Sequence, residues 1–255
     1  MNILLTNDDG LKADGLIAAY EALTKRGHQV TACAPDRQRS GQSQAVTLRV
    51  PLTASPSPMP GGQTGYAISG TPADCARLGF TTLAPKPLDL VISGINDDAN
   101  LGYDANYSGT AAAALEAAGE GLPSMAVSLG RGEGPHDWDM AAAVLVEAAE
   151  SFSLWKIPPG LMVNINIPPM LSDPLWAWTT LNPYPSPDRY VQTGPDSFIR
   201  RRFEEDCRVL EGSDIDLFRA GRISLSPVGG VAHDQQTLQR LKASIKLAAH
   251  AQKSL

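Results

Sequence analysis

The chain begins with a strand-length apolar run that stops at an acidic turn. Residues 2–6 are too few for a helix, and the four residues that follow, Asn7-Asp8-Asp9-Gly10, have the composition of a tight turn. The next segment places apolar residues on one helical face, at Leu16, Ile17, Tyr20 and Leu23. Strand, turn and helix in this order make the first unit of an open α/β sheet, in which ligands bind beyond the carboxyl ends of the strands.

The alternation of strand and helix continues to residue 169. Further strands are predicted at 28–34, 88–93, 124–129 and 162–167, and helices are predicted to begin at Thr71, Ser108 and Asp137. The run 88–93 is almost entirely apolar, as in a parallel strand that is covered on both faces. The sequence therefore predicts an α/β fold, a Rossmann-like three-layer sandwich with a mostly parallel sheet.

Two segments depart from this alternation. Val46, Leu48 and Val50 alternate with polar or small residues and predict a half-buried strand, and 51–65 predicts a loop or a hairpin connection that returns at Tyr66. Residues 170–235 contain several prolines and short β-type runs, which predict an appended C-terminal β arm that reaches a partner subunit. An amphipathic terminal helix is predicted from Thr237 to His250. We expect a catalytic core at 1–169 and an oligomerisation region at 170–255.

Composition limits the classes of protein to which the chain can belong. Hydrophobic residues make up 43% of the 255 residues and charged residues 19%, which allows a substantial core. The net charge of −6 argues against a general binder of nucleic-acid duplexes, but not against small phosphorylated ligands that a metal accompanies. Three widely spaced cysteines argue against a zinc site or a disulfide framework. Without a signal peptide or a long apolar stretch, we expect a cytoplasmic protein with no membrane association.

Polar loops gather at one edge of the predicted sheet. They contain Asp8-Asp9, Ser40-Gly41, Gly94-Ile95-Asn96 and Ser108-Gly109-Thr110. Each loop alone has the composition of an ordinary turn or helix cap, and only their joint placement suggests a site. Two carboxylates, a hydroxyl and an amide oxygen suit one hard divalent cation. The Ser-Gly-Thr helix start offers N–H groups and the positive end of a helix dipole to a phosphate.

A series of longer motifs follows the same order as in one known family. They are Ile3-Leu4-Leu5-Thr6-Asn7-Asp8-Asp9-Gly10, Ala34-Pro35-Asp36, Ser69-Gly70-Thr71-Pro72-Ala73-Asp74-Cys75, Ser93-Gly94-Ile95-Asn96, Tyr107-Ser108-Gly109-Thr110-Ala111 and Asn164-Ile165-Asn166-Ile167-Pro168. With these motifs the chain resembles the SurE family, stationary-phase survival proteins that act as metal-dependent 5′/3′-nucleotidases. The resemblance covers most of the chain.

The resemblance implies an activity and a set of roles. The chain would hydrolyse nucleoside 5′-monophosphates, and also 3′-monophosphates, with one divalent cation, Mg²⁺ or Mn²⁺, per subunit of a homodimer or homotetramer. Asp8, Asp9, Ser40 and Asn96 would hold the cation, and Asn100, Ser108, Gly109 and Thr110 would line the phosphate side. Asp8 and Asp9 would be the catalytic residues. Which of the two acts as general base, or whether one attacks as a nucleophile, is left open by the sequence.

One departure from the family pattern and two rival classes remain. Asp97-Asp98 follows Asn96 where we expect a basic, small or neutral pair; the two residues could repel polyphosphates, add a metal ligand or remain solvated. A receiver-type signalling module also holds Mg²⁺ with paired acids, but it needs an aspartate at the end of the central strand, where this chain has Asn96. A non-catalytic nucleotide-binding protein differs from an enzyme by whether phosphate is released. A dinucleotide-binding enzyme is disfavoured because no Gly-x-Gly-x-x-Gly follows the first strand.

Overall fold

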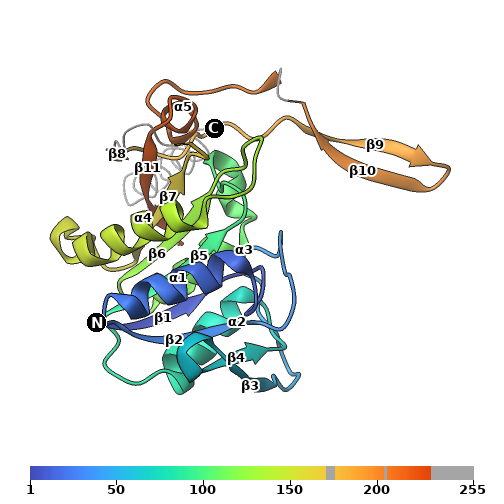
Figure 1. Ribbon diagram of the computed structural model, residues 1–255. Helices are drawn as coiled ribbons and strands as arrows, with labels where there is room; N and C mark the ends of the chain where they lie inside the picture. The colour runs from blue at the N-terminus through green and yellow to red at the C-terminus, as the bar shows by residue number, and fades with distance from the viewer. Residues whose placement is uncertain (171–175, 204–205, 231–255) are drawn as a thin grey trace, which may run out of the picture.

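The computed structural model describes residues 1–170, 176–203 and 206–230, and its centre is a large sheet (Figure 1). The strands of this sheet are β1 (Asn2–Thr6), β2 (Gln29–Pro35), β3 (Ala54–Pro58), β4 (Thr64–Ile68), β5 (Leu90–Asn96), β6 (Ser124–Leu129), β7 (Leu161–Ile167), β8 (Trp176–Trp178) and β11 (Ile223–Gly229). Their order among the described residues is β3-β4-β2-β1-β5-β6-β7-β11-β8.

The sheet is parallel through its middle. β1 pairs in parallel with β2 on one side and β5 on the other, and β5, β6 and β7 continue in parallel. Antiparallel pairs occur only toward the edges of the described sheet, between β3 and β4 and between β7 and β11. The buried strands β5 and β6 have no exposed residue, which is why their sequences lack a polar face.

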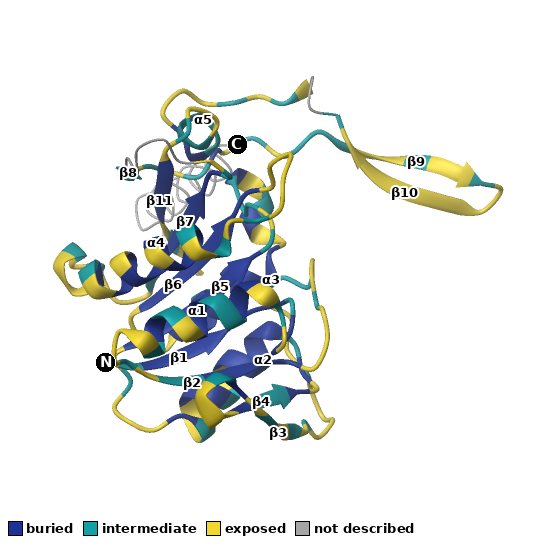
Figure 2. Ribbon diagram, in the orientation of Figure 1, coloured by how far each residue is buried: buried dark blue, intermediate teal, exposed yellow. Residues whose placement is uncertain are grey.

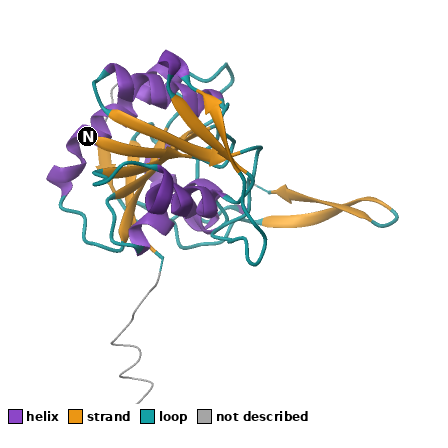
Figure 3. Ribbon diagram, turned by 90° about the horizontal axis from the view of Figure 1, so that it is seen from below, coloured by secondary structure: helices purple, strands orange, loops and turns teal. Residues whose placement is uncertain are grey.

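Helices cover both faces of the sheet (Figure 3). One face carries α1 (Asp14–Lys25) and α4 (Trp138–Ser151), whose buried residues join one core cluster. The other face carries α2 (Pro72–Leu78) and α3 (Gly109–Gly119), where Cys75 packs with Ala113 and Leu4 of β1. The buried strands lie between these two layers (Figure 2). The predicted three-layer α/β sandwich is confirmed.

Shorter helical segments connect these elements. They are η1 (Pro60–Gly62), η2 (Gly79–Leu83), η3 (Gly102–Asn106), η4 (Phe152–Trp155) and α5 (Asp214–Arg219). The predicted caps are present: Thr71 accepts a hydrogen bond from the Asp74 N–H at the start of α2, and Ser108 accepts one from the Ala111 N–H at the start of α3. No helix in the described residues has both the length and the apolar character needed to cross a bilayer.

The predicted strand at Val46, Leu48 and Val50 is wrong. This segment has no regular structure, and the three side chains are 48%, 73% and 64% exposed. Strand β4 is paired on both sides, with β2 and with β3, so it is not available as a partner for this segment. Apolar alternation alone does not supply such a partner. The expected return strand near Tyr66 is present as β4, but residues 51–65, predicted as a loop or a hairpin connection, contain the strand β3.

The predicted C-terminal arm is shorter than residues 170–235. β8 and β11 belong to the main sheet, because β11 pairs antiparallel with β7 and parallel with β8. Among the strands of the described residues, only β9 (Asp188–Gly194) and β10 (Ser197–Arg202) leave the sheet, as an antiparallel hairpin that projects from the body (Figures 1 and 2). The sheet thus continues beyond residue 169, and the division into two domains there stays a prediction. The predicted helix 237–250 lies outside the described residues.

Candidate active site

Acidic and amide side chains meet at the carboxyl ends of β1 and β5. Asp8 and Asp9 follow β1 directly, and Asn96 is the last residue of β5. The two strands pair in parallel, with Thr6 opposite Ser93, so that both ends lie at the same edge. Asp9 and Asp97, which comes just after β5, line the same cleft. The predicted meeting of these two loops is confirmed.

Gly94 lets β5 reach this edge. Its φ of 141° lies in a region that side chains rarely adopt, and a Cβ there would lie 2.3 Å from the carbonyl oxygen of Val127 in β6. A larger residue would therefore force β5 away from β6 and displace Asn96, two residues later.

Helix α3 begins against Asp8. Gly109 approaches so closely that a Cβ there would lie 2.7 Å from the Asp8 Cβ and 2.8 Å from its Oδ2. Thr110, fully buried, donates its hydroxyl to the Asp8 carboxylate. The structure thus places Thr110, expected beside the phosphate, in contact with a carboxylate of the expected metal set.

The two carboxylates differ in environment. Asp8 is 4% exposed, and burial raises its pKa despite the hydrogen bond from Thr110. Asp9 is half-buried; burial first, and then the negative charges of Asp8 and Asp97, raise its pKa to about 6. Adjacent carboxylates that resist ionisation are stabilised by a cation that neutralises both. The local electrostatics therefore fit a divalent cation at this turn.

Ser40 lies on the loop that follows β2. The backbone N–H of Arg39 donates to the Asp8 carbonyl oxygen over 2.7 Å, which brings the exposed Ser40 next to the acidic turn. Asn96 donates its Nδ2 to the carbonyl oxygen of Asp98 over 2.6 Å, so its Oδ1 is the atom of that amide suited to a cation. In the described part of the chain no three His, Cys, Asp or Glu residues gather as a metal site. A cation here would depend on two carboxylates and on neutral oxygens.

Asn100 belongs to a buried polar network that sequence reasoning missed. Its Nδ2 donates to Ser128 Oγ over 2.8 Å, and its backbone N–H donates to Asn166 Oδ1 over 2.7 Å. Asn164 and Asn166 both donate to the Asn100 carbonyl oxygen. The sequence indicated such a network, because two asparagines on one face of a buried apolar strand, Asn164 and Asn166, require hydrogen-bond partners. The network fixes the loop between β5 and α3.

A cleft of about 500 Å³ opens beside Asp9. Gln38 and Asp97 line it together with His136 and Trp138, whose rings stack with centroids 4.7 Å apart. The His136 ring also hydrogen-bonds the Asp97 carbonyl oxygen through Nε2 at 2.9 Å, and sequence reasoning gave this histidine no role. The larger cleft of about 820 Å³ lies beside His28 at the opposite edge of the sheet, away from the acidic pair. The chemistry thus points to the smaller cleft.

The extra acidic pair is neutralised in part. Arg131 contacts Asp97 Oδ2 at 3.0 Å and Asp98 Oδ2 at 3.7 Å, and Asp98 is exposed. This pairing weakens the argument that these residues repel polyphosphates. Arg39, one of the arginines near Ser40, donates to the Ser69 carbonyl oxygen and contacts Asp36, so it holds the loop.

Comparisons with known proteins identify the family that the chain resembles. The family model described as "Survival protein SurE" matches residues 3–183. A curated 5′-nucleotidase SurE from Kosmotoga olearia is 34% identical over 252 residues, which cover 96% of this chain and 99% of that protein. One from Lawsonia intracellularis is 48% identical over 170 residues, 66% of each chain. The crystal structure of SurE protein from Aquifex aeolicus has a TM-score of 0.79 and 30% identity, and the match covers 94% of this chain and 98% of that one.

Proposed function

This chain belongs to the SurE family, and we propose that it is a metal-dependent phosphomonoesterase that hydrolyses nucleoside 5′-monophosphates to nucleoside and phosphate. Nucleoside 3′-monophosphates are a second substrate class by the same resemblance. The curated relatives are named 5′-nucleotidases, which supports an enzyme over a receiver-type or non-catalytic binding protein. The site also lacks the phosphate-accepting aspartate of a receiver, since β5 ends in Asn96.

The observation that carries this proposal is the buried acidic pair against the start of a helix. Asp8 and Asp9 have raised pKa values, so they disfavour a metal-free ionised state, and α3 points its N-terminus at the same place. A cation next to a helix N-terminus suits a phosphate monoester, because both compensate its negative charge. Neither feature alone distinguishes this site from a capped turn.

The residues present fit one divalent cation per subunit. Asp8, Asp9, Ser40 and Asn96 would supply hard oxygen ligands, which suit Mg²⁺ or Mn²⁺. When bound, such an ion neutralises the phosphoryl oxygens and acidifies water.

The chain's own groups would divide the remaining work. Ser108, Gly109 and Asn100 would bind and orient the phosphate at the start of α3. Asp8 is engaged by Thr110, whereas Asp9 lines the open cleft, so Asp9 is the better placed carboxylate to hold a proton from water. Asp8 would hold the cation in a fixed position.

We also propose that the protein is a cytoplasmic homo-oligomer, a dimer or tetramer, held partly by the β9–β10 hairpin. Tyr190 is 74% exposed, Phe198 61% and Ile199 49%, an unusual set of apolar side chains for a projecting hairpin. Contact with a second copy of the chain would cover them. Light scattering at micromolar concentration tests this, and a monomer would contradict it.

A phosphate-release screen tests the activity. Nucleoside mono-, di- and triphosphates would be incubated with and without Mg²⁺ or Mn²⁺, and with exhaustive chelation. We expect release from AMP-type substrates only with added metal, and less release from ATP. Undiminished turnover after chelation contradicts the metal assignment, and no release from any monophosphate contradicts the enzyme assignment.

A further inference from the structure

None of the proposed metal ligands or phosphate-binding residues lies in the motif Ser69-Gly70-Thr71-Pro72-Ala73-Asp74-Cys75. It begins α2, where Thr71 and Asp74 form a reciprocal capping box. Asp74 is only 7% exposed, which is unusual for a capping carboxylate. A buried carboxylate needs partners beyond one cap.

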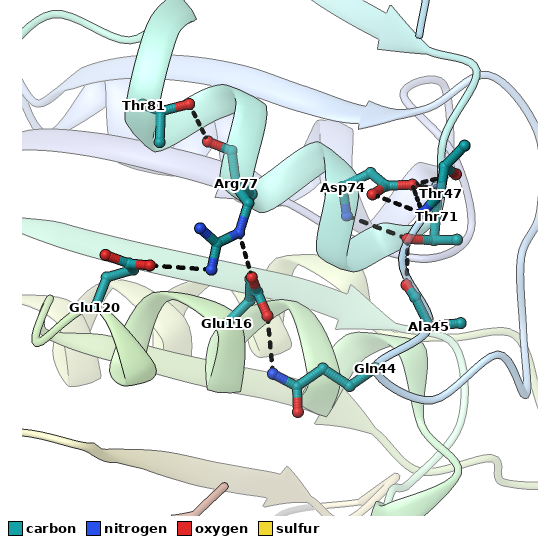
Figure 4. A network of polar contacts seen from close by, with 9 residues as sticks. All are labelled: Gln44, Ala45, Thr47, Thr71, Asp74, Arg77, Thr81, Glu116 and Glu120. Carbon is teal, nitrogen blue, oxygen red and sulfur yellow. Dashed lines mark hydrogen bonds and ion pairs between the residues drawn. The ribbon is translucent and has the colours of Figure 1, made fainter. Parts of the chain in front are cut away.

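Asp74 finds those partners in the loop that carries Ser40 (Figure 4). Thr47 donates its backbone N–H to Asp74 Oδ1 and Oδ2, both at 3.1 Å, and its hydroxyl to Oδ2 at 2.5 Å. Thr71, next to it, donates its hydroxyl to the Ala45 carbonyl oxygen over 2.7 Å. The capping box of α2 therefore also holds the end of the loop that follows β2.

A second buried carboxylate holds the middle of the same loop. Glu116 of α3 accepts a hydrogen bond from the Gln44 side chain at 2.8 Å, and Arg77 of α2 pairs with the other Glu116 oxygen at 2.5 Å (Figure 4). The loop also reaches the segment before α3, because Ser43 donates its N–H to the Tyr107 carbonyl oxygen. With the Arg39 contact to Asp8, hydrogen bonds hold the loop on both sides of Ser40.

The backbone of this loop needs such support. Ser43 has a φ of 51° and Arg49 a φ of 61°, and only one other described residue that is not glycine has a positive φ. Such conformations persist when surrounding contacts fix them. The segment has no strand or helix of its own, and most of its side chains are exposed.

We propose that Asp74 is a positioning residue: through Thr47 it fixes the loop 39–49 so that Ser40 stays beside the Asp8–Asp9 turn. The inference rests on the proposed function in one respect, namely that Ser40 is a ligand of the cation. Asp74 itself lies outside the reacting groups and acts through the loop.

The charge state of Asp74 agrees with this role. Burial by itself would raise its pKa, but the hydrogen bonds from Thr47 and Thr71 outweigh burial and lower the pKa below its usual value. Asp74 is thus a fixed anion at neutral pH. Hydrogen bonds to a charged acceptor are stronger than neutral ones.

Three variants test the role, with two matched controls. Thr47→Val removes the hydroxyl, Asp74→Asn removes the charge, and Ser40→Ala removes the expected ligand. Thr47→Ser keeps the hydroxyl and should behave as the parent protein. Thr81→Val removes a hydroxyl that donates to the Arg77 carbonyl oxygen of the preceding turn at 2.6 Å and lies 3.2 Å from the Thr82 hydroxyl, so it controls for loss of a threonine hydrogen bond away from the loop.

The first measurement needs no activity. Trypsin can cut after Arg39 and Arg49 only when the loop leaves its folded conformation, and mass spectrometry identifies the cut. We expect cleavage at these sites to quicken about tenfold in Thr47→Val and Asp74→Asn, the change that losing one hydrogen bond to a charged group produces. Thr81→Val and Thr47→Ser should match the parent. Circular dichroism checks that each variant is folded.

The second measurement is the Mn²⁺ concentration that gives half of the full thermal stabilisation. It should rise about tenfold in Thr47→Val and Asp74→Asn, while turnover at saturating Mn²⁺ stays near the parent value. A merely structural role would lower the melting temperature without moving this midpoint. Thr47→Val is the milder change, so its cleavage rate and Mn²⁺ midpoint test the proposal if Asp74→Asn does not fold.

The two measurements together separate the positioning role of Asp74 from the role of Ser40 as a ligand of the cation. Unchanged cleavage in both variants overturns the role of Asp74, whatever the activity. Faster cleavage with an unchanged Mn²⁺ midpoint overturns the positioning of Ser40 toward the cation. In that case Ser40→Ala tells which idea failed: a raised midpoint leaves the metal set intact, whereas an unchanged midpoint overturns the place of Ser40 in that set as well.

Discussion

Replacing Asp9 with asparagine should make the metal-free protein more stable at neutral pH. Burial and the charges of Asp8 and Asp97 raise the Asp9 pKa from its ordinary 3.8 to about 6. The folded protein therefore binds this proton more tightly than the unfolded chain. The stability that the proton contributes is complete below about pH 4 and is lost as pH rises through about 6.

The magnitude follows from these two pKa values. The difference between the ordinary and the folded-state pKa of Asp9 corresponds to a loss of about 3 kcal/mol in the free energy of unfolding at pH 7.5. Because Asp9 is partly exposed, solvent screening reduces this loss to about 1–2 kcal/mol. Asp9→Asn is nearly isosteric and removes the charge. We expect its free energy of unfolding, with the metal chelated, to exceed that of the parent by about 1–2 kcal/mol at pH 7.5. The difference should fall to about a third of this value at pH 4.5, because Asp9 is then protonated in the folded protein while most of the unfolded chains are still ionised there.

Urea denaturation in the presence of a chelator, at both pH values, measures this difference. Glu147→Gln, on the exposed face of α4, is the matched control for loss of a carboxylate. The reasoning is refuted if Asp9→Asn destabilises the metal-free protein at pH 7.5, or if its effect is the same at both pH values. Either result would mean that Asp9 is not held in an unfavourable ionised state.

Other changes at the site and the hairpin have equally specific outcomes. Asp8→Asn and Asp9→Asn should each lower phosphate release by at least about a hundredfold while the fold stays intact, and the thermal stabilisation by Mn²⁺ should shrink. If both variants keep the activity of the parent protein, residues 7–10 form a turn with no catalytic role. Gly109→Ala should destabilise the protein by about 1–3 kcal/mol in urea denaturation, because its Cβ would lie 2.7 Å from the Asp8 Cβ. Replacing the exposed Phe198 and Ile199 with serine should shift the protein toward monomer in light scattering while its circular dichroism is unchanged.

The sequence predicted the fold and the acidic edge because both depend on local patterns. Each strand of the parallel middle is an apolar run of strand length, and Asp8-Asp9 and Asn96 come directly at the ends of two such runs. Carboxyl ends of parallel strands share one edge, so the meeting of these residues needed no knowledge of packing. The caps at Thr71 and Ser108 were equally local.

The sequence failed where a segment depends on distant neighbours. Val46, Leu48 and Val50 alternate like a strand, yet β4, the strand expected to return beside them, pairs with β2 and β3 instead. The run at Ile223 was assigned to the arm, but it pairs with β7 as part of the main sheet. Strand pairing is a property of two segments, and one segment does not reveal its partner.

The sequence by itself determined the strands and helices of the parallel middle of the sheet and the residue types that follow its strands. Only the tertiary structure decided how the buried carboxylates are supported: Thr110 donates to Asp8 across 102 positions of the chain, and Thr47 to Asp74 across 27. These contacts form because burying a carboxylate requires donors, and the fold selects which donors are within reach. Local propensity carries no information about which donors reach a buried carboxylate, since their position depends on the packing of whole helices against the sheet.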